Sequence, residues 1–371
     1  MIKRRPLFDG GNFVIDFLTS SLEGFTAQTR RSLLRHAPNT PLPGGKKIRL
    51  IRDLEQKKLR VGPGFAPKVG IRNPEQAGSV LSFDIQPVTY PTYHAISNNT
   101  ALEEELNISN PSATAAILLT TEEDGSHRVL VQQRSPRNRL YAETIGASVA
   151  GLFDGQLDRD SANRGRLSPI DTNAIKANAL KEMKEEIQLD ATDIAWLHIT
   201  GLARDKVKIH SEFLLLGLLR LSTDQIAQKA GSKIPASSND EDDFVEKSVV
   251  VSATLEAIET LVTQMKCPLP PTHTAAFIAA GYWMLLRDAH LSAASQWVNR
   301  LEPDVRENYR EIDHIVDTFC KKDPGKRSEE LRGFDPAHSQ ASQGLPDAIS
   351  ELMRVDLLLN ERAAQGLKGE V

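Results

Sequence analysis

The segment from 173 to 189, NAIKANALKEMKEEIQL, constrains the fold more than any other part of the chain. Residues three and four apart are neighbours on a helix, so a helix here places the carboxylates of Glu182, Glu185 and Glu186 on one face. The opposite face carries an apolar stripe, which predicts packing against a sheet. This stripe consists of Ala174, Ala177, Leu180, Met183 and Ile187. The pattern predicts a helix with one buried side and one side that gathers negative charge.

The three glutamates are a candidate site for a divalent cation. Like charges at these spacings cost an isolated helix about 0.2–0.5 kcal/mol per pair. Hard carboxylate oxygens suit Mg²⁺ or Mn²⁺, which also bridges phosphate oxygens. The alternative interpretation is an acidic helix face in water, and the string KEMKEE alone fits both.

Strands and helices surround this segment in an order typical of an α/β protein. The runs AAILLTT and HRVLVQQRS flank EEDGS, whose Asp-Gly pair predicts a hairpin. The run EFLLLGLLRL lacks alternation, which predicts a strand buried on both faces. Further strands are expected at 79–90, 194–203 and 245–251, and further helices at 254–265, 275–301, 305–320 and 348–364.

The string KEMKEEIQL resembles the second half of the signature of the Nudix family of pyrophosphohydrolases. Lys181 stands in place of the signature's Arg, and Gln188 stands in place of its second Gly. Upstream, ASVAG ends at Gly151 and resembles the glycine turn of the family's loop–helix–loop element. The resemblance covers roughly Ser79 to Met265, and it implies an α/β fold, specifically a Nudix-type α/β/α sandwich.

The chain departs from that signature between the glycine and the glutamates. Gly151 and Glu182 are 31 positions apart, roughly twice the distance in the signature, and Asn173 stands in register with the family's upstream Glu. In the family, that Glu and the Arg mainly orient the helix, so their absence predicts a different supporting set. The polar segment from Asp154 to Asp171 holds the extra residues, and we expect it to be a mobile loop over the substrate.

The resemblance assigns roles to residues on and after the helix. Glu182, Glu185 and Glu186, with the carbonyl of Gly151, would bind Mg²⁺ or Mn²⁺. Glu182 and Glu186 would act in catalysis.

The general base is expected in a later acidic loop, where Glu246 is the first choice. The other acidic residues of that loop are Glu241, Asp242 and Asp243. Glu212 and His210 are further alternatives, each better explained as structural. Arg134, after the hairpin, is a candidate for binding substrate phosphate.

The implied function is Mg²⁺-dependent hydrolysis of a nucleoside diphosphate linked to another moiety, as in nucleotides or nucleotide sugars. A rival hypothesis is a catalytically weak or inactive Nudix-like module that senses a nucleotide. A third hypothesis is an isomerase of the isopentenyl-diphosphate type, which needs a cysteine at the metal site. Cys267 and Cys320 are both far from the motif in sequence.

Charge and length indicate three parts: a basic N-terminal extension (1–78), a Nudix-like domain (79–265) and a C-terminal helical region (266–371). The whole chain has a net charge of -4, which excludes a generally basic nucleic-acid-binding protein. Residues 1–70, however, contain fourteen Lys and Arg against five Asp and Glu. This segment would bind nucleic acid or a protein partner, or dock on the acidic body or on a second subunit of a homodimer.

The sequence also predicts a cytoplasmic protein without membrane segments. No run of 18 apolar residues occurs, and Asp9 and Asp16 interrupt the apolar stretch near the start. Two cysteines are too few for a disulfide scaffold.

Overall fold

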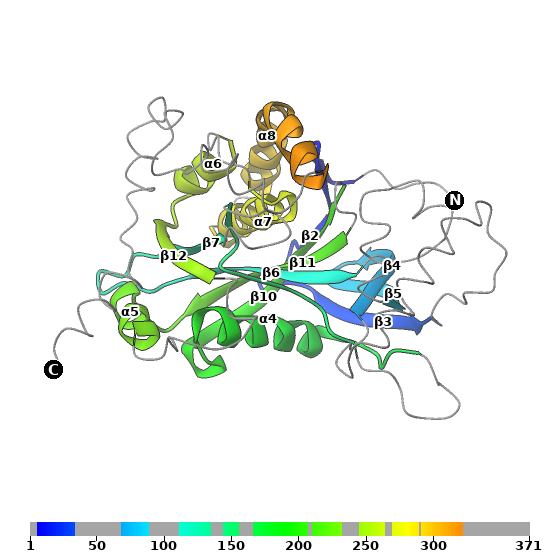
Figure 1. Ribbon diagram of the computed structural model, residues 1–371, viewed down its shortest axis with the longest axis horizontal. Helices are drawn as coiled ribbons and strands as arrows, with labels where there is room; N and C mark the ends of the chain where they lie inside the picture. The colour runs from blue at the N-terminus through cyan, green and yellow to red at the C-terminus, as the bar shows by residue number, and fades with distance from the viewer. Residues whose placement is uncertain are drawn as a thin grey trace.

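The computed structural model describes residues 6–33, 68–88, 111–134, 144–155, 166–206, 210–231, 245–263, 269–288 and 291–321. Their strands form one sheet of nine and one of three. Helices lie on both faces of the larger sheet, so the chain is of the α/β class (Figure 1).

The larger sheet is mixed, with the order β1-β2-β10-β11-β6-β7-β12, while β8 pairs with β7 and β9 with β6. Its strands are β1 (Phe8–Asp9), β2 (Phe13–Leu18), β6 (Ser112–Leu119), β7 (Arg128–Arg134), β8 (Ile145–Gly146), β9 (Val149–Leu152), β10 (Ile194–Asp205), β11 (His210–Leu219) and β12 (Val245–Ser252). Strands β6 and β11 run parallel at its centre, and the other pairs are antiparallel. A strand with covered faces on both sides needs no polar alternation, which explains the apolar run of β11.

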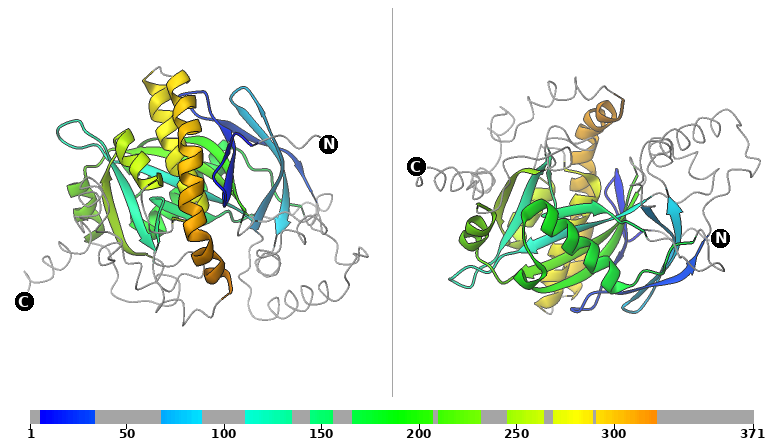
Figure 2. Two further views of the ribbon diagram at one scale, coloured as in Figure 1. Left: turned by 90° about the horizontal axis from the view of Figure 1, so that it is seen from above. Right: turned by 60° about the horizontal axis from the view of Figure 1, so that its bottom comes forward.

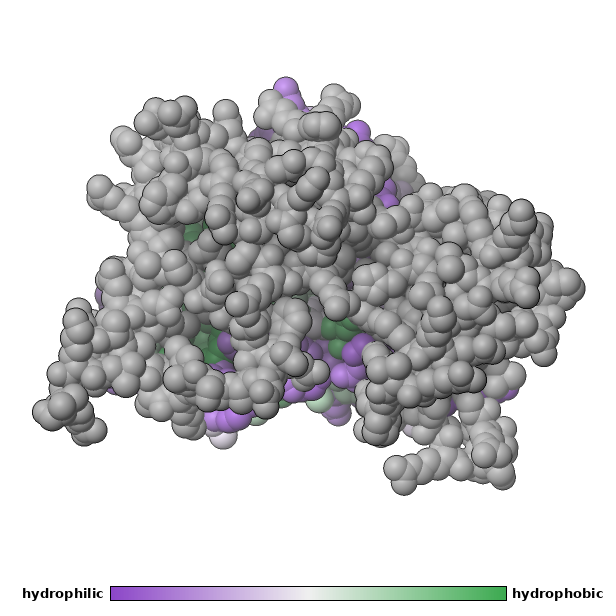
Figure 3. Space-filling view, viewed as in Figure 1, coloured by the Kyte–Doolittle hydropathy of each residue, from purple (hydrophilic) through white to green (hydrophobic). Residues whose placement is uncertain are grey.

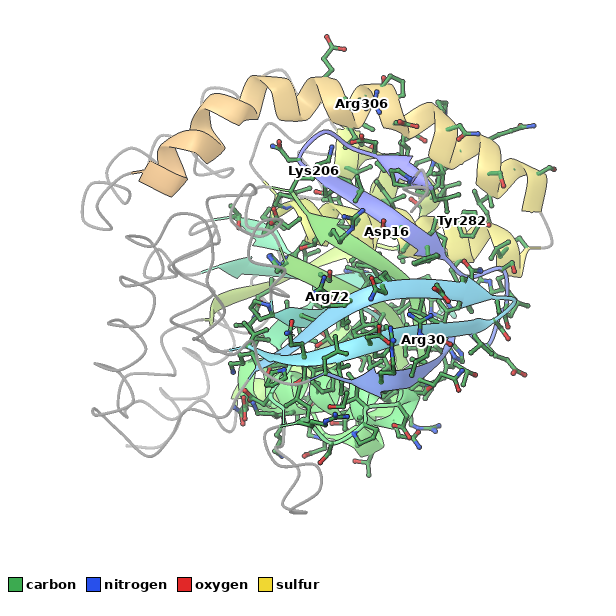
Figure 4. The ribbon with its side chains drawn as sticks, turned by 90° about the vertical axis from the view of Figure 1, so that its right-hand side faces the viewer. Asp16, Arg30, Arg72, Lys206, Tyr282 and Arg306 are labelled. Atoms are coloured by element: carbon green, nitrogen blue, oxygen red, sulfur yellow. The ribbon has the colours of Figure 1, made fainter. Side chains whose placement is uncertain are left out.

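The smaller sheet has the order β3-β5-β4 and lies beside the helix α4 (Thr172–Ile187), on the same face of the larger sheet (Figure 2). Its strands are β3 (Thr26–Ser32), β4 (Lys68–Ala77) and β5 (Val80–Val88). The rings of Phe83 and Phe213 meet with centroids 5.4 Å apart, which joins the two sheets in one core. Asp84 is fully buried and accepts two hydrogen bonds from Arg31, at 3.1 and 2.6 Å. Figure 4 shows Arg30 and Arg72 on the same sheet.

The opposite face of the larger sheet carries α6 (Leu255–Thr263), α7 (Pro271–Arg287) and α8 (Leu291–Lys321), while α5 (Thr223–Gly231) follows β11 near one end (Figure 1). Helix α7 begins at a proline, which suits the first turn because its missing N–H has no partner there. It is buried almost all round, and Trp283 packs against Trp196 of β10 with centroids 5.1 Å apart. Tyr282 and Trp283 are both buried, so these aromatic side chains serve packing.

Several predictions from the local pattern are confirmed. The Asp-Gly turn joins β6 and β7, and Gly125 has a φ of 79°. The expected strands at 79–90, 194–203, 212–221 and 245–251 correspond to β5, β10, β11 and β12. The expected helix at 348–364 lies outside the described residues.

The predicted apolar stripe of α4 is right for Met183 and Ile187 and wrong for Ala177. The buried apolar side chains are Ile175, Ala179, Met183 and Ile187, whereas Ala177 is exposed. Helix residues four apart lie nearly above one another, so the bulky Ile175, Met183 and Ile187 decide which row turns inward. The small side chains of Ala174 and Ala177 bury less apolar surface and therefore have less influence on which row is buried.

Of the expected boundaries between the three parts, the one at 78 falls in the turn between β4 and β5, at Gly78. The one at 265 lies outside the described residues. Strand β2 pairs with β10 in the larger sheet, and Lys206 binds Asp9 at 2.7 Å. Helix α8 passes over these N-terminal strands, where Arg306 binds the carbonyl of Asp9 at 2.6 Å (Figure 4). The described parts of segment 1–78 are therefore strands of the two sheets.

The prediction of a mobile loop from Asp154 to Asp171 is wrong for its second half. Leu167 and Ile170 are buried in the core beside β3. The hydroxyl of Ser32 donates to the carbonyl of Leu167 at 2.7 Å, and that of Thr29 to the carbonyl of Ile170 at 2.8 Å. Two apolar residues and these backbone partners anchor the segment despite its polar composition. Residues 156–165 lie outside the described part.

Within the described residues, none of the helices has the length and apolar character that spanning a membrane requires.

Candidate functional site

Helix α4 is bounded by two defined caps. Asp171 begins it by accepting a hydrogen bond from the N–H of Ala174 at 2.9 Å. Gln188 ends it in the left-handed conformation, with a φ of 56°, and its N–H bonds the carbonyl of Met183. Glycine normally takes this C-terminal position, and a side chain there is strained. With Gln188 in place of the signature's Gly, the helix still ends at this position, but the backbone of residue 188 is strained.

Gly151 and Glu182 are in direct contact, although they are 31 positions apart in the chain. Gly151 lies in β9, paired with Thr114 of β6. A Cβ atom at Gly151 would stand 2.0 Å from the carboxyl carbon of Glu182. Any side chain at 151 would displace that carboxylate, so a glycine is required at this close approach.

Glu186 lies one turn further along the same row and also touches β9. Its Oε2 accepts a hydrogen bond from the N–H of Ala150 at 3.2 Å. Asn178, one turn before Glu182, donates from Nδ2 to Thr114 Oγ1 at 2.9 Å and to the carbonyl of Gly151 at 3.4 Å. The sequence interpretation missed Asn178, whose spacing of four before Glu182 was the available signal.

Glu185 has a different environment from the other two glutamates. Its side chain is 57% exposed, whereas that of Glu182 is 12% exposed. Lys181 Nζ lies 3.7 Å from Glu185 Oε2. The expected trio thus divides into two carboxylates against β9 and one exposed carboxylate beside a lysine.

The site can be compared with the needs of the cation that the resemblance implies. Among the residues that the structure describes, no three His, Cys, Asp or Glu side chains form a group able to hold a metal ion. Mg²⁺ usually keeps several waters and takes one or two carboxylates, with substrate phosphates completing its shell. Glu182, Glu186 and the Gly151 carbonyl are hard oxygen donors side by side, and they fit that smaller requirement.

The electrostatics of Glu182 favour a cation. Burial raises the pKa of Glu182 above its ordinary value, Lys181 opposes this shift, and the neighbouring Glu185 and Asp154 add to it. Removing water from a carboxylate disfavours its charged form, and a nearby positive charge restores it. Glu182 is therefore a largely buried acid whose charge Lys181 and Lys68 balance only in part.

The supporting residues differ from those of the signature, as predicted. Lys181 occupies the position of the signature's Arg, and its Nζ lies 3.2 Å from Asp154 Oδ2. Lys68 of β4 forms an ion pair with the other oxygen of Asp154. The smaller sheet thereby reaches the loop that follows Gly151.

The backbone brings the predicted base and the predicted phosphate ligand to the same end of one strand pair. Val245 of β12 pairs with Arg134 of β7, and a bulge interrupts the ladder at Glu246. Bulges are frequent next to active sites. The other candidates for the base, Glu241, Asp242 and Asp243, lie outside the described residues.

Glu212 and His210 lie on the other face of the sheet, beneath α7. Alternate residues of β11 face opposite cores, and Leu214 and Leu216 face the one that contains α7. His210 Nε2 is 2.7 Å from Glu212 Oε1, and both side chains are buried. His273 of α7 accepts the N–H of Ala147 at 3.0 Å. The interpretation of Glu212 and His210 as structural agrees with this position.

Hydrophilic residues line the lower margin of the molecule, where α4 lies in the same view (Figure 3).

Comparisons with known proteins were made for the whole chain. No protein-family model and no curated protein matches it. Among solved structures, it is similar to a mutT/nudix family protein from Listeria innocua, with 18% identity and a TM-score of 0.30 over 48% of this chain and 96% of that one. It is also similar to DR0079 from Deinococcus radiodurans, with 12% identity and a TM-score of 0.28 over 45% and 81%. Function is therefore inferred from the residues of the site.

Proposed function

We propose that the chain is a Nudix-type pyrophosphohydrolase that uses Mg²⁺ or Mn²⁺ to cleave a nucleoside diphosphate linked to another moiety. The observation that carries the proposal is the contact of Glu182 with Gly151 and of Glu186 with Ala150. Two carboxylates beside a carbonyl give a cation the hard donors it prefers and leave room for phosphate oxygens.

The chain's own residues divide the work of hydrolysis. Glu182 and Glu186 hold the cation, Arg134 binds a substrate phosphate, and Glu246 accepts the proton of the attacking water. The water oxygen bonds to one phosphorus while the anhydride P–O bond breaks, so two phosphate-containing products leave. When bound, the cation neutralises charge on the phosphate oxygens and lowers the pKa of the attacking water.

A panel of nucleotides incubated with Mg²⁺ tests this proposal. It should contain nucleoside triphosphates, ADP-ribose, a nucleotide sugar and a dinucleoside polyphosphate, with monophosphate or phosphate release as the readout. We expect at least one to be hydrolysed, and Glu186→Gln to abolish the activity. Lys206→Ala is the matched surface control, since Lys206 binds Asp9 at 2.7 Å on the edge strands.

The other outcomes of the panel are equally informative. Mg²⁺-dependent binding of a nucleotide without product would replace the hydrolase with a nucleotide sensor. Product formation that persists after chelation of Mg²⁺ would overturn both functions.

A further inference from the structure

Asp154 lies between two lysines from distant parts of the chain. Lys181 Nζ of α4 is 3.2 Å from its Oδ2, and Lys68 of β4 pairs with its Oδ1. The side chain of Lys181 is 46% exposed, that of Lys68 is 22% exposed and that of Asp154 is 37% exposed. Asp154 is thus partly buried and bridges the smaller sheet and α4.

Backbone hydrogen bonds fix the position of Asp154. Lys68 and Asp154 form a β-bridge, and the N–H of Val69 donates to the carbonyl of Phe153 at 3.0 Å. The N–H of Phe153 donates to the carbonyl of Ser112 at 2.8 Å, and the Ser112 hydroxyl donates to Val69 at 2.6 Å. Two strands, β4 and β6, therefore hold Asp154 in place, three residues after Gly151.

Lys181 has two kinds of acidic neighbour. Its Nζ is 3.2 Å from Asp154 but 3.7 Å from both Glu182 Oε1 and Glu185 Oε2. A lysine that is paired with Glu182 competes with any cation for that carboxylate, because both neutralise the same charge. Asp154 is the nearest partner of Lys181, which stays within ion-pair distance of Glu182 but makes its shorter contact with Asp154.

We propose that Asp154 is a positioning residue that keeps Lys181 from pairing more closely with Glu182 and so keeps this carboxylate available to a divalent cation. Asp154 acts through Lys181 and does not itself touch the cation. The proposal rests on the proposed function, because it concerns the same two carboxylates. It assigns the smaller sheet, through Lys68, a part in setting the affinity for the cation.

Titration of the full chain with Mn²⁺ alone, followed by calorimetry, tests the proposal without turnover. We expect Asp154→Asn to weaken Mn²⁺ binding about tenfold, the lower end for residues that support metal ligands. The double variant Asp154→Asn/Lys181→Met should recover most of the affinity, since the freed lysine is gone. Lys206→Ala, which removes another lysine–aspartate pair between segments, should bind as the wild type does.

The outcomes separate this proposal from the proposed function. Unchanged Mn²⁺ affinity in Asp154→Asn, or a double variant as weak as the single one, overturns the positioning role. If the wild type binds Mn²⁺ but hydrolyses nothing in the nucleotide panel, hydrolysis fails and the positioning role stands. A wild type that binds no Mn²⁺ overturns both.

Melting temperatures of the variants check that each is folded. If Asp154→Asn does not fold, the Mn²⁺ affinity of the single variant Lys181→Met tests the proposal. It should bind Mn²⁺ at least as tightly as the wild type, and a tenfold loss contradicts the proposal.

Discussion

The two faces of the larger sheet each bury a glutamate, and the two glutamates are balanced differently. On the α7 face, burial by itself would raise the pKa of Glu212, but the hydrogen bond from His210 and the charges of His210 and His273 lower it to about 2. On the α4 face, burial raises the pKa of Glu182, and Lys181 offsets this only in part. The charge of Glu212 is thus balanced by buried histidines, whereas the pKa of Glu182 stays raised.

This difference teaches how to separate structural from functional acids in the same chain. A buried carboxylate with a buried cationic partner stabilises the fold, and removing one partner is costly. A buried carboxylate without such a partner weakens the fold until a ligand supplies the charge. The same mutation at the two sites should therefore have opposite effects.

The largest expected effect is on turnover at the α4 face. Glu182→Gln should lower turnover at least about 10²-fold, because the site loses a cation donor that no neighbour replaces. Without metal, its melting temperature should equal or exceed that of the wild type, since a desolvated charge has been removed. Steady-state kinetics and thermal denaturation measure both. A variant that melts lower and turns over normally would make Glu182 a structural residue.

The same substitution on the α7 face should act on stability alone. Glu212→Gln should destabilise the protein by about 3 kcal/mol, because it removes the nearer of the two carboxylates that face the buried His210, the other being Asp205 at 3.9 Å. Turnover per folded molecule should be unchanged, since the sheet separates Glu212 from Glu182. Urea denaturation gives the free energy of unfolding. A loss of turnover in folded Glu212→Gln would mean that the two faces are functionally coupled.

The stability of the protein at acidic pH should also depend on Glu212. A carboxyl group whose pKa is lower in the folded than in the unfolded state stabilises the protein at pH values above its unfolded-state pKa. That stability disappears as the pH falls through the folded-state pKa. For Glu212 the window runs from 4.5 down to about 2, and the loss is about 3 kcal/mol. Denaturation at a series of pH values should show a smaller loss over this window in Glu212→Gln. Equal slopes in the two proteins would contradict the assignment.

The smallest effect concerns the end of α4. Gln188→Gly should stabilise the protein by about 1 kcal/mol, because glycine takes a φ of 56° without strain. Cation affinity should not change, since the cap is separate from the row of Glu182 and Glu186. Gln28→Gly, in β3, is the matched control and should be destabilising. A destabilised Gln188→Gly would show that the glutamine side chain contributes more than the backbone strain costs.

Local features of the fold were readable from the sequence. The Asp-Gly turn between β6 and β7 and the apolar run of β11 depend on residues close together in the chain, so they were predicted with their approximate bounds. The same is true of α4 and of the row that carries Glu182 and Glu186. The N-terminal strands were not predicted, because proline and glycine clusters obscured their pattern and their partners are far away in sequence.

What the sequence by itself determined is the chemistry that α4 can offer, because helical periodicity alone aligns its carboxylates. Only the tertiary structure decided that Gly151 receives Glu182, that Asn178 supports them and that Glu185 stays outside with Lys181. It also decided that Lys68 and Asp154 meet across 86 positions. Contacts of this kind depend on which surfaces bury each other when the sheets close, and no pattern within a short segment carries that information.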